Sequence, residues 1–283
     1  MFLDRMSLKK LRNIREANLT LHHKTNVIIG ENAAGKTTLL EAVDILSRGR
    51  SFRTNKTENL VCHGNNSFYV GATLGPDKKK LEIEKSKNRT KISINGKEEK
   101  KQSRLAQELA IQSIHPNSHS LIEGAPSERR AFLDWGLFHV EHEFRKEWSS
   151  YIKILRQRNE ALKSGGGDEK TWMEKLAVSG EIVSSLREKY VLGLEKSIIE
   201  TQKYLMPESE IIFYYEKGWG KDKSFMESLT EKRSLDMDRG YTSSGPQNAD
   251  IKIMLNGKEA QKICSRGQQK LIANIMLLSQ AKD

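Results

Sequence analysis

The residues best suited to do chemistry form one loop near the start of the chain. Residues 30–37 read Gly-Glu-Asn-Ala-Ala-Gly-Lys-Thr, which satisfies the phosphate-binding pattern G-x-x-x-x-G-K-[ST] at every fixed position. The two glycines let the backbone curl so that its N–H groups face a polyphosphate. We therefore predict binding of a nucleoside triphosphate, although nothing in the loop distinguishes ATP from GTP. The alternative is a glycine-rich turn before an ordinary helix.

Two side chains of this loop have specific expected roles. Lys36 should place its ammonium against the β- and γ-phosphates, which makes it a candidate catalytic residue, and the Thr37 hydroxyl should be a ligand of Mg²⁺. A helix starting here adds unpaired N–H groups and the positive end of its dipole. The candidate cofactor-binding residues are Gly30, Glu31, Asn32, Ala33, Ala34, Gly35, Lys36, Thr37 and Thr38.

The flanking sequence predicts the elements that position the loop. Val27–Ile29 is typical of a short buried strand, and the residues after the loop form an amphipathic helix to about Ser47, closed by Gly49. Two further strands precede Val27. Alternating apolar residues at 67–74, 80–84 and 91–94, with an Asn-Gly turn at 95–96, predict an antiparallel meander beside the nucleotide core.

The middle of the chain is predicted to be helical. Apolar residues recur at three- and four-residue steps in one long helix that starts at Pro126 and that Gly165–Gly167 ends. A second long helix follows, with one apolar stripe formed by Trp172, Leu176, Ile182, Leu186, Tyr190, Leu194, Ile198 and Leu205. Two such helices predict an antiparallel hairpin, a short coiled-coil arm. A strand at 210–215, a helix at 222–239 and a late hairpin at 251–258 follow.

Composition restricts the class of protein. The 283 residues carry a net charge of +11 with a pI near 9.5, which favours a polyanionic partner, nucleic acid before an anionic membrane. A solvated, mildly basic protein is the alternative. No apolar run approaches the roughly 20 residues of a membrane span, and the N-terminus lacks a secretory signal, so we expect a cytoplasmic protein. Cys62 and Cys264 are expected to be free thiols.

A second motif lies near the end of the chain. Ser265-Arg266-Gly267-Gln268-Gln269-Lys270 opens an amphipathic helix, and Ser265 with Gln268 alone is a capping box, a purely structural device. Together with the phosphate-binding loop, however, the motif resembles the signature of ABC-type ATPases. In those proteins the signature of one subunit closes over the γ-phosphate held by the other. The resemblance implies nucleotide contacts in trans by Ser265, Gly267 and Gln268, with Ser265 catalytic.

The order of motifs along the whole chain narrows this resemblance. Ser51-Phe52-Arg53-Thr54, the block from Leu121 to Asp134 containing E-G-A-P-S-E-R-R-A-F-L-D, and Gly245-Pro246 stand between the two motifs. The sequence thus resembles the RecF family of bacterial recombination mediators. The implied fold is α/β, with an ABC-type ATP-binding lobe (residues 1–112 and 240–283) carrying the β meander, and a helical lobe (113–239) carrying the hairpin arm.

The resemblance also implies a function. RecF-like proteins bind ATP with Mg²⁺, dimerise on ATP to bind double-stranded, gapped or junction DNA, hydrolyse ATP slowly under DNA stimulation, and cooperate with mediator proteins in recombinational repair and replication. Arg129 and Arg130 are candidates for DNA or interlobe contacts. The alternative for this pair is an ion-pair cluster with Glu128 at a helix start.

Three departures from the family pattern keep a second interpretation open. Gln247 and Asn248 replace a His and an Arg, Pro116-Asn117-Ser118 replaces P-E-D or P-E-H, and the sequence stops at Asp283, before the acidic strand that follows the signature helix in ABC ATPases. The alternative is therefore a truncated or decayed phosphate-loop protein that binds nucleotide or DNA without hydrolysis. A transporter subunit fits the basic charge and the helical arm less well.

Overall fold

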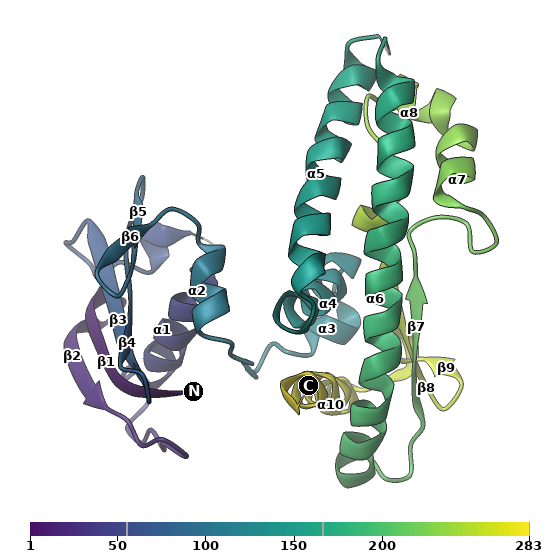
Figure 1. Cartoon of the computed structure of the whole chain (residues 1–283). Helices are drawn as coiled ribbons and strands as arrows, with labels where there is room; N and C mark the ends of the chain where they lie inside the picture. Colours follow the sequence, from purple (N-terminus) through teal and green to yellow (C-terminus); the bar gives the residue numbers. More distant parts are fainter. Residues whose placement is uncertain (55, 166, 283) are drawn as a thin grey trace. The chain divides into compact units, whose positions relative to one another are not determined.

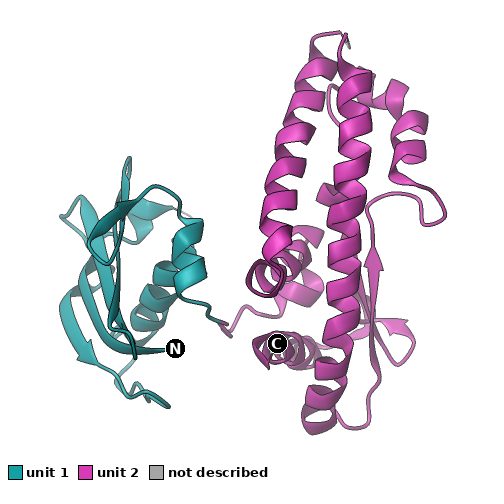
Figure 2. Cartoon of the chain, viewed as in Figure 1, with its two compact units in different colours: residues 1–111 teal, residues 112–283 magenta. Residues whose placement is uncertain are grey.

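The computed structural model describes residues 1–54, 56–165 and 167–282. They form two compact units, residues 1–111 and 112–283, each with its own hydrophobic core (Figure 2). Gly166, in the predicted interhelical turn, and Asp283, the predicted end of the ATP-binding lobe, lie outside the described residues.

Unit 1 is a six-stranded antiparallel sheet in the order β2-β1-β3-β4-β5-β6, with helix α1 (Lys36–Arg48) packed on one face (Figure 1). The sheet forms because alternate residues of its strands, such as Leu8 and Val70, are fully buried against Ile45 and other apolar residues of α1. The predicted meander and α1 are confirmed. The strands are β1 Phe2–Leu11, β2 Ile14–Thr20, β3 Ser67–Gly75, β4 Lys79–Ser86, β5 Thr90–Ile94 and β6 Lys97–Glu99.

Two short helices complete unit 1, η1 (Thr57–Asn59) and α2 (Ser103–Glu108). The predicted turn between β5 and β6 is present, with Asn95 and Gly96 both at positive φ, 51° and 78°. Glycine tolerates this conformation without a Cβ penalty, and asparagine tolerates it better than most residues. The local turn chemistry was therefore sufficient to place this hairpin.

The strand predicted at Val27–Ile29 is wrong. The segment is not assigned to a strand, and Val27 and Ile29 are 77% and 87% exposed. A strand is stable only when a neighbour satisfies its backbone N–H and C=O groups. Among the described residues no strand pairs with this segment, so its apolar composition is not sufficient to make it a strand.

Unit 2 is built on the antiparallel pair α5 (His142–Lys163) and α6 (Glu169–Leu205), which lie side by side along most of the length of α5 (Figure 1). The predicted hairpin arm is confirmed, and α6 buries Leu176, Tyr190 and Leu194 as expected. Ile182 was predicted on the same stripe but is 41% exposed, and Val183 takes the buried position.

The first long helix is in fact two. Helix α4 (Pro126–Val140) ends before α5 begins, and Glu141 between them has an extended backbone and caps α5 through its side chain, which accepts the N–H of Glu143. The prediction of one helix failed because Leu137 and Phe144 are seven residues apart, a spacing that also fits an uninterrupted helix.

The rest of unit 2 packs around this pair. Residues 222–239, predicted as one helix, form two, α7 (Phe225–Glu231) and α8 (Arg233–Arg239), separated at Lys232. The late hairpin is confirmed and joins a three-stranded sheet, β7-β8-β9. Assignment of residues 240–283 to the ATP-binding lobe stays a prediction. The remaining elements are α3 Ser120–Glu123, β7 Ile211–Glu216, η2 Pro246–Asn248, β8 Asp250–Leu255, β9 Lys258–Glu259, α9 Ala260–Ile263 and α10 Arg266–Lys282.

Candidate nucleotide-binding site

The predicted phosphate-binding loop is an exposed turn at the start of α1. The Lys36 ammonium donates to the carbonyl oxygens of Gly30 and Glu31, each at 2.7 Å, and so bridges the two ends of the turn. Ala33 and Gly35 have positive φ angles, 64° and 97°, which curl the chain around the helix start. The lysine is therefore held at the mouth of the loop by main-chain oxygens, contacts that a phosphate oxygen can replace.

The start of α1 offers free hydrogen-bond donors. In the described structure the backbone N–H groups of Lys36, Thr37 and Thr38 have no acceptor, and no side chain caps the helix. Three such donors together with the positive end of the helix dipole form an anion site. The Thr37 side chain is exposed beside them, so its hydroxyl fits the expected role of a Mg²⁺ ligand shared with phosphate oxygens.

Asn13, in the turn between β1 and β2, forms hydrogen bonds that hold the predicted phosphate-binding loop in place. Its side-chain amide donates to the carbonyl oxygen of Ala33 at 2.8 Å, and its carbonyl oxygen accepts the Thr38 hydroxyl at 3.2 Å. Thr38 is 4% exposed, so its side chain has a structural contact and its backbone N–H remains the part available to a nucleotide. Sequence reasoning missed Asn13, because only the fold brings that turn against the loop.

Behind the loop, α1 buries a carboxylate. Glu41 is 0% exposed and forms a two-bonded ion pair with Arg12, with Nε–Oε2 at 2.5 Å and Nη2–Oε1 at 2.7 Å. Ser51 donates its hydroxyl to the same carboxylate and accepts the backbone N–H of Arg53. The S-F-R-T segment is thereby fixed to α1. A signal was available in the sequence: a glutamate on the apolar face of a helix needs a partner.

The second predicted motif lies at the start of α10 in unit 2. Ser265 and Gln268 form a reciprocal capping box: the Ser265 Oγ accepts the Gln268 N–H at 3.3 Å, and the Gln268 side chain accepts the Ser265 N–H at 2.9 Å. The structural alternative is thus realised in this state. Ser265, Gly267 and Gln268 are nevertheless exposed, so a partner molecule can reach this helix start.

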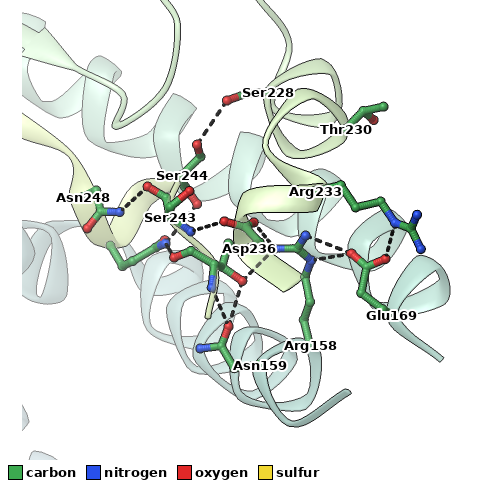
Figure 3. Close-up of polar contacts among 12 residues, drawn as sticks. Arg158, Asn159, Glu169, Ser228, Thr230, Arg233, Asp236, Ser243, Ser244 and Asn248 are labelled. Atoms are coloured by element: carbon green, nitrogen blue, oxygen red, sulfur yellow. Dashed lines mark hydrogen bonds and ion pairs between the residues drawn. The ribbon is translucent and has the colours of Figure 1, made fainter. Parts of the chain in front are cut away.

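A buried polar network holds the segment that leads to this motif (Figure 3). Arg158 on α5, Glu169 on α6 and Asp236 on α8 are each 0% exposed, and Arg158 donates to both carboxylates at 2.8 Å. Asp236 also accepts the backbone N–H of Ser243, and Arg158 donates to the Thr242 hydroxyl. The tip of the helical arm is therefore tied to the chain that runs into η2 and β8.

The two residues that depart from the family pattern at this turn have structural contacts. Gln247 donates to the carbonyl oxygen of Ser244 at 2.9 Å and accepts the Tyr151 hydroxyl, and Asn248 donates to the carbonyl oxygen of Ser243 at 2.9 Å. Amide side chains can donate and accept at once. Here they close the turn from within.

Arg129 and Arg130 both make contacts inside unit 2. Arg129 is 5% exposed and forms a two-bonded pair with Asp250, at 2.6 and 2.9 Å, while also donating to the carbonyl oxygens of Ile122 and Gly124. Arg130 is half-buried and donates to the carbonyl oxygen of Ala249. The partner of Arg129 is therefore the distant Asp250 rather than Glu128. A DNA contact by either arginine stays a prediction.

Comparisons with known proteins identify the family to which this chain belongs. Residues 2–282 match the family described as RecF/RecN/SMC N terminal domain. The DNA replication and repair protein RecF of Psychromonas ingrahamii is 37% identical over 99% of this chain and 80% of its own length, and that of Chromohalobacter salexigens is 33% identical over 99% and 79%. This chain belongs to the RecF family. The expected family and fold class are confirmed.

Solved structures agree with the RecF assignment. The recombination mediator protein RecF-ATP of the RecFOR pathway has a TM-score of 0.91 at 27% identity, over 99% of this chain and 80% of that one. An Smc head domain from Pyrococcus furiosus shares the fold, with a TM-score of 0.59 at 13% identity. The described part of the chain contains no helix long and apolar enough to cross a membrane, and Cys62 and Cys264 are free, as expected.

Proposed function

We propose that this chain is an ATP-dependent DNA-binding protein of recombinational repair and replication. One observation carries the proposal: the start of α1 presents three acceptor-free N–H groups beside the Lys36 ammonium and the exposed Thr37 hydroxyl. A site with these groups suits a triphosphate bound with Mg²⁺. Membership of the RecF family, which includes the solved RecF-ATP structure, selects ATP as the nucleotide.

The second half of the site is supplied in trans by another copy. The loop belongs to unit 1 and the Ser265–Gln268 motif to unit 2, and the motif is exposed at a helix start that can meet an anion. On dimerisation the Ser265 Oγ and the Gly267 N–H contact the γ-phosphate held by the partner copy. Binding energy from two sandwiched nucleotides then drives closure, so ATP controls the dimer.

Within that closed site the residues have separate tasks. Lys36 would leave the carbonyl oxygens of Gly30 and Glu31 for the phosphates, and the Thr37 hydroxyl would help to hold Mg²⁺. Asn13 keeps the turn at Ala33 in place. Bound Mg²⁺ supplies charge neutralisation at the phosphates. Hydrolysis is slow and DNA-stimulated, and the closed dimer binds double-stranded or gapped DNA in the cytoplasm together with mediator proteins.

Substituting Lys36 tests the proposal. Loss of a charge-assisted contact to phosphate costs about 1.5–3 kcal/mol, so Lys36→Met should weaken ATP binding roughly 10- to 150-fold and abolish ATP-dependent dimerisation, measured by calorimetry and by mass in solution. Lys24→Met, an exposed lysine of the same unit, is the matched control and should behave like the parent.

Substituting Ser265 separates nucleotide binding from closure. Ser265→Arg should bind ATP normally but remain a monomer with ATP and Mg²⁺, because the bulky cation occupies the contact surface in trans. Dimerisation of Lys36→Met at parental ATP concentrations would refute the ATP switch, and dimerisation of Ser265→Arg would refute the trans contact. Phosphate release with and without DNA, measured on the same proteins, reports hydrolysis.

A further inference from the structure

The excess positive charge belongs almost entirely to one unit. Residues 1–111 contain 22 of the 48 Lys and Arg but 12 of the 37 Asp and Glu, a net charge of +10, whereas residues 112–283 have a net charge of +1. The helical arm and the signature motif therefore lie in a nearly neutral unit. Long-range attraction for a polyanion originates in unit 1.

The sheet face opposite α1 carries charges of both signs, with Arg5, Lys80 and Lys91 beside Glu82, Glu84 and Glu98. One shallow hollow there, of about 380 Å³, is lined by Glu82, Glu84 and Glu98 with Lys91 as its only cation among the lining residues of the described chain. The Tyr69 hydroxyl donates to Glu82 at 2.8 Å on the same face. Carboxylates at these positions repel phosphate, so this hollow is unsuited to a nucleic acid backbone.

The charge gathers instead where three strands end beside the C-terminus of α1. Lys85 on β4 donates to the carbonyl oxygen of Gly49 at 3.2 Å, and Gln102 donates to that of Arg48 at 2.7 Å. The pairings Lys85↔Thr90 and Ile92↔Glu99 bring the ends of β4, β5 and β6 to the same edge. We name this set the strand-end cluster: Arg50, Lys85, Lys87, Arg89, Lys100 and Lys101.

Most of this cluster is not needed to hold unit 1 together. The C-terminus of α1 is already closed by the Gly49 N–H on the Ile45 carbonyl and by Gln102 and Lys85 on the carbonyls of Arg48 and Gly49. Apart from Lys85, which is half-buried, the cluster residues are exposed. The exposed cations of the cluster therefore contribute little to the stability of unit 1, and we look for their role in binding an anionic partner.

Nearby carboxylates neutralise the cluster only in part: the pKa of Glu99 is lowered by the backbone N–H of Lys101 and, to a smaller extent, by the charges of Arg104 and Lys101. Asp44 is paired with Arg48 at 3.3 Å and Glu99 with Arg104 at 3.5 Å. Within the cluster only Lys87 has an ion pair in the described structure, with Glu58 at 3.8 Å, and an exposed pair of this length is weak. Burial lowers the pKa of Lys85, so an anion at this edge would stabilise its charged form.

We propose that the strand-end cluster binds the phosphate backbone of duplex DNA, an inference that rests on the proposed function and gives the DNA a place on unit 1. The cations come from separate strand ends, a turn and a helix end, and so form an array along an edge instead of converging on one small anion. Duplex DNA presents a phosphate charge about every 1.7 Å along its axis. Such an array suits contacts that are independent of base sequence.

A matched pair of charge variants tests the assignment in the full chain. The cluster variant is Lys87→Gln, Arg89→Gln, Lys100→Gln and Lys101→Gln together. The control variant removes the same charge at the opposite ends of the strands and in the loop after β2, through Lys24→Gln, Lys78→Gln, Lys80→Gln and Lys97→Gln, all exposed residues. Affinity for a fluorescent duplex is measured with ATP and Mg²⁺ over a series of salt concentrations.

The cluster variant should bind duplex DNA at least about tenfold more weakly. The slope of log affinity against log salt should fall by about 0.9 for each phosphate that the protein no longer neutralises, so by about 3 to 4. The control should change the slope by less than about 1. Both variants should still dimerise with ATP.

Two results would count against the assignment in different ways. Equal losses of affinity in the two variants, or no loss in the cluster variant, would overturn the inference alone. A parent protein that binds no DNA with ATP and Mg²⁺ would overturn it together with the DNA part of the proposed function.

Discussion

Replacing Arg129 by methionine should destabilise unit 2 without any direct effect on a DNA-binding surface. The substitution keeps the length of the aliphatic stem but leaves the Asp250 carboxylate without the arginine that donates to both of its oxygens, and leaves the carbonyl oxygens of Ile122 and Gly124 without a donor. Breaking a buried ion pair from one side costs about 3–5 kcal/mol. With a urea dependence of about 2–3 kcal/mol per molar, the unfolding midpoint should fall by about 1–2.5 M.

The neighbouring arginine is the control for this measurement. Arg130 is half-buried and makes one hydrogen bond, to the carbonyl oxygen of Ala249 at 2.8 Å, and burial lowers its pKa. Arg130→Met should therefore cost only about 1 kcal/mol. Urea unfolding followed by tryptophan fluorescence measures both variants, and duplex binding is measured where each is folded. Parental stability of Arg129→Met combined with a selective loss of DNA affinity would show that the arginine contacts DNA and that its buried pair is unimportant.

Three further outcomes follow from the same structure. Arg158→Met should cost at least about 3–5 kcal/mol, because it leaves Glu169 and Asp236 buried without their shared cation; the urea midpoint checks it, and exposed Arg156→Met should have no effect. Asn13→Ala should weaken ATP binding by about 1 kcal/mol, roughly fivefold, because the turn at Ala33 loses its support, with calorimetry as the measurement. Gly35→Ala should lower ATP affinity further, since φ is 97° there and an added Cβ would lie 3.3 Å from the Ile14 side chain; parental affinity would show that the loop relaxes.

The parts of the fold that the sequence predicted correctly are those set by neighbours along the chain. The turn before α1, the end of α1 at Gly49 and the turn at Asn95-Gly96 depend on backbone preferences of a few adjacent residues. The helical hairpin follows from a periodic apolar stripe sustained over many turns. Such signals are complete within a short window, so no knowledge of tertiary contacts was needed.

The errors have two physical origins. Val27–Ile29 has the composition of a buried strand, but pairing depends on a second strand that can come from anywhere in the chain, and the described residues supply none. At Glu141 the apolar spacing continues through a helix break, so periodicity could not reveal it. Residues 222–239 also divide into two helices, at Lys232.

The sequence by itself determined the chemistry of the two motifs, because residue type and spacing specify which donors, cations and hydroxyls a short segment can present. Only the tertiary structure decided what surrounds them. Arg129 meets Asp250 across 121 positions of sequence, Arg12 meets Glu41 across 29, and Asn13 meets the loop at Ala33. Likewise the positive charge is visible in the composition, but its concentration at one edge of unit 1 depends on strand register. Ion pairs and charged surfaces are set by distance in space, and the path of the folded chain determines those distances.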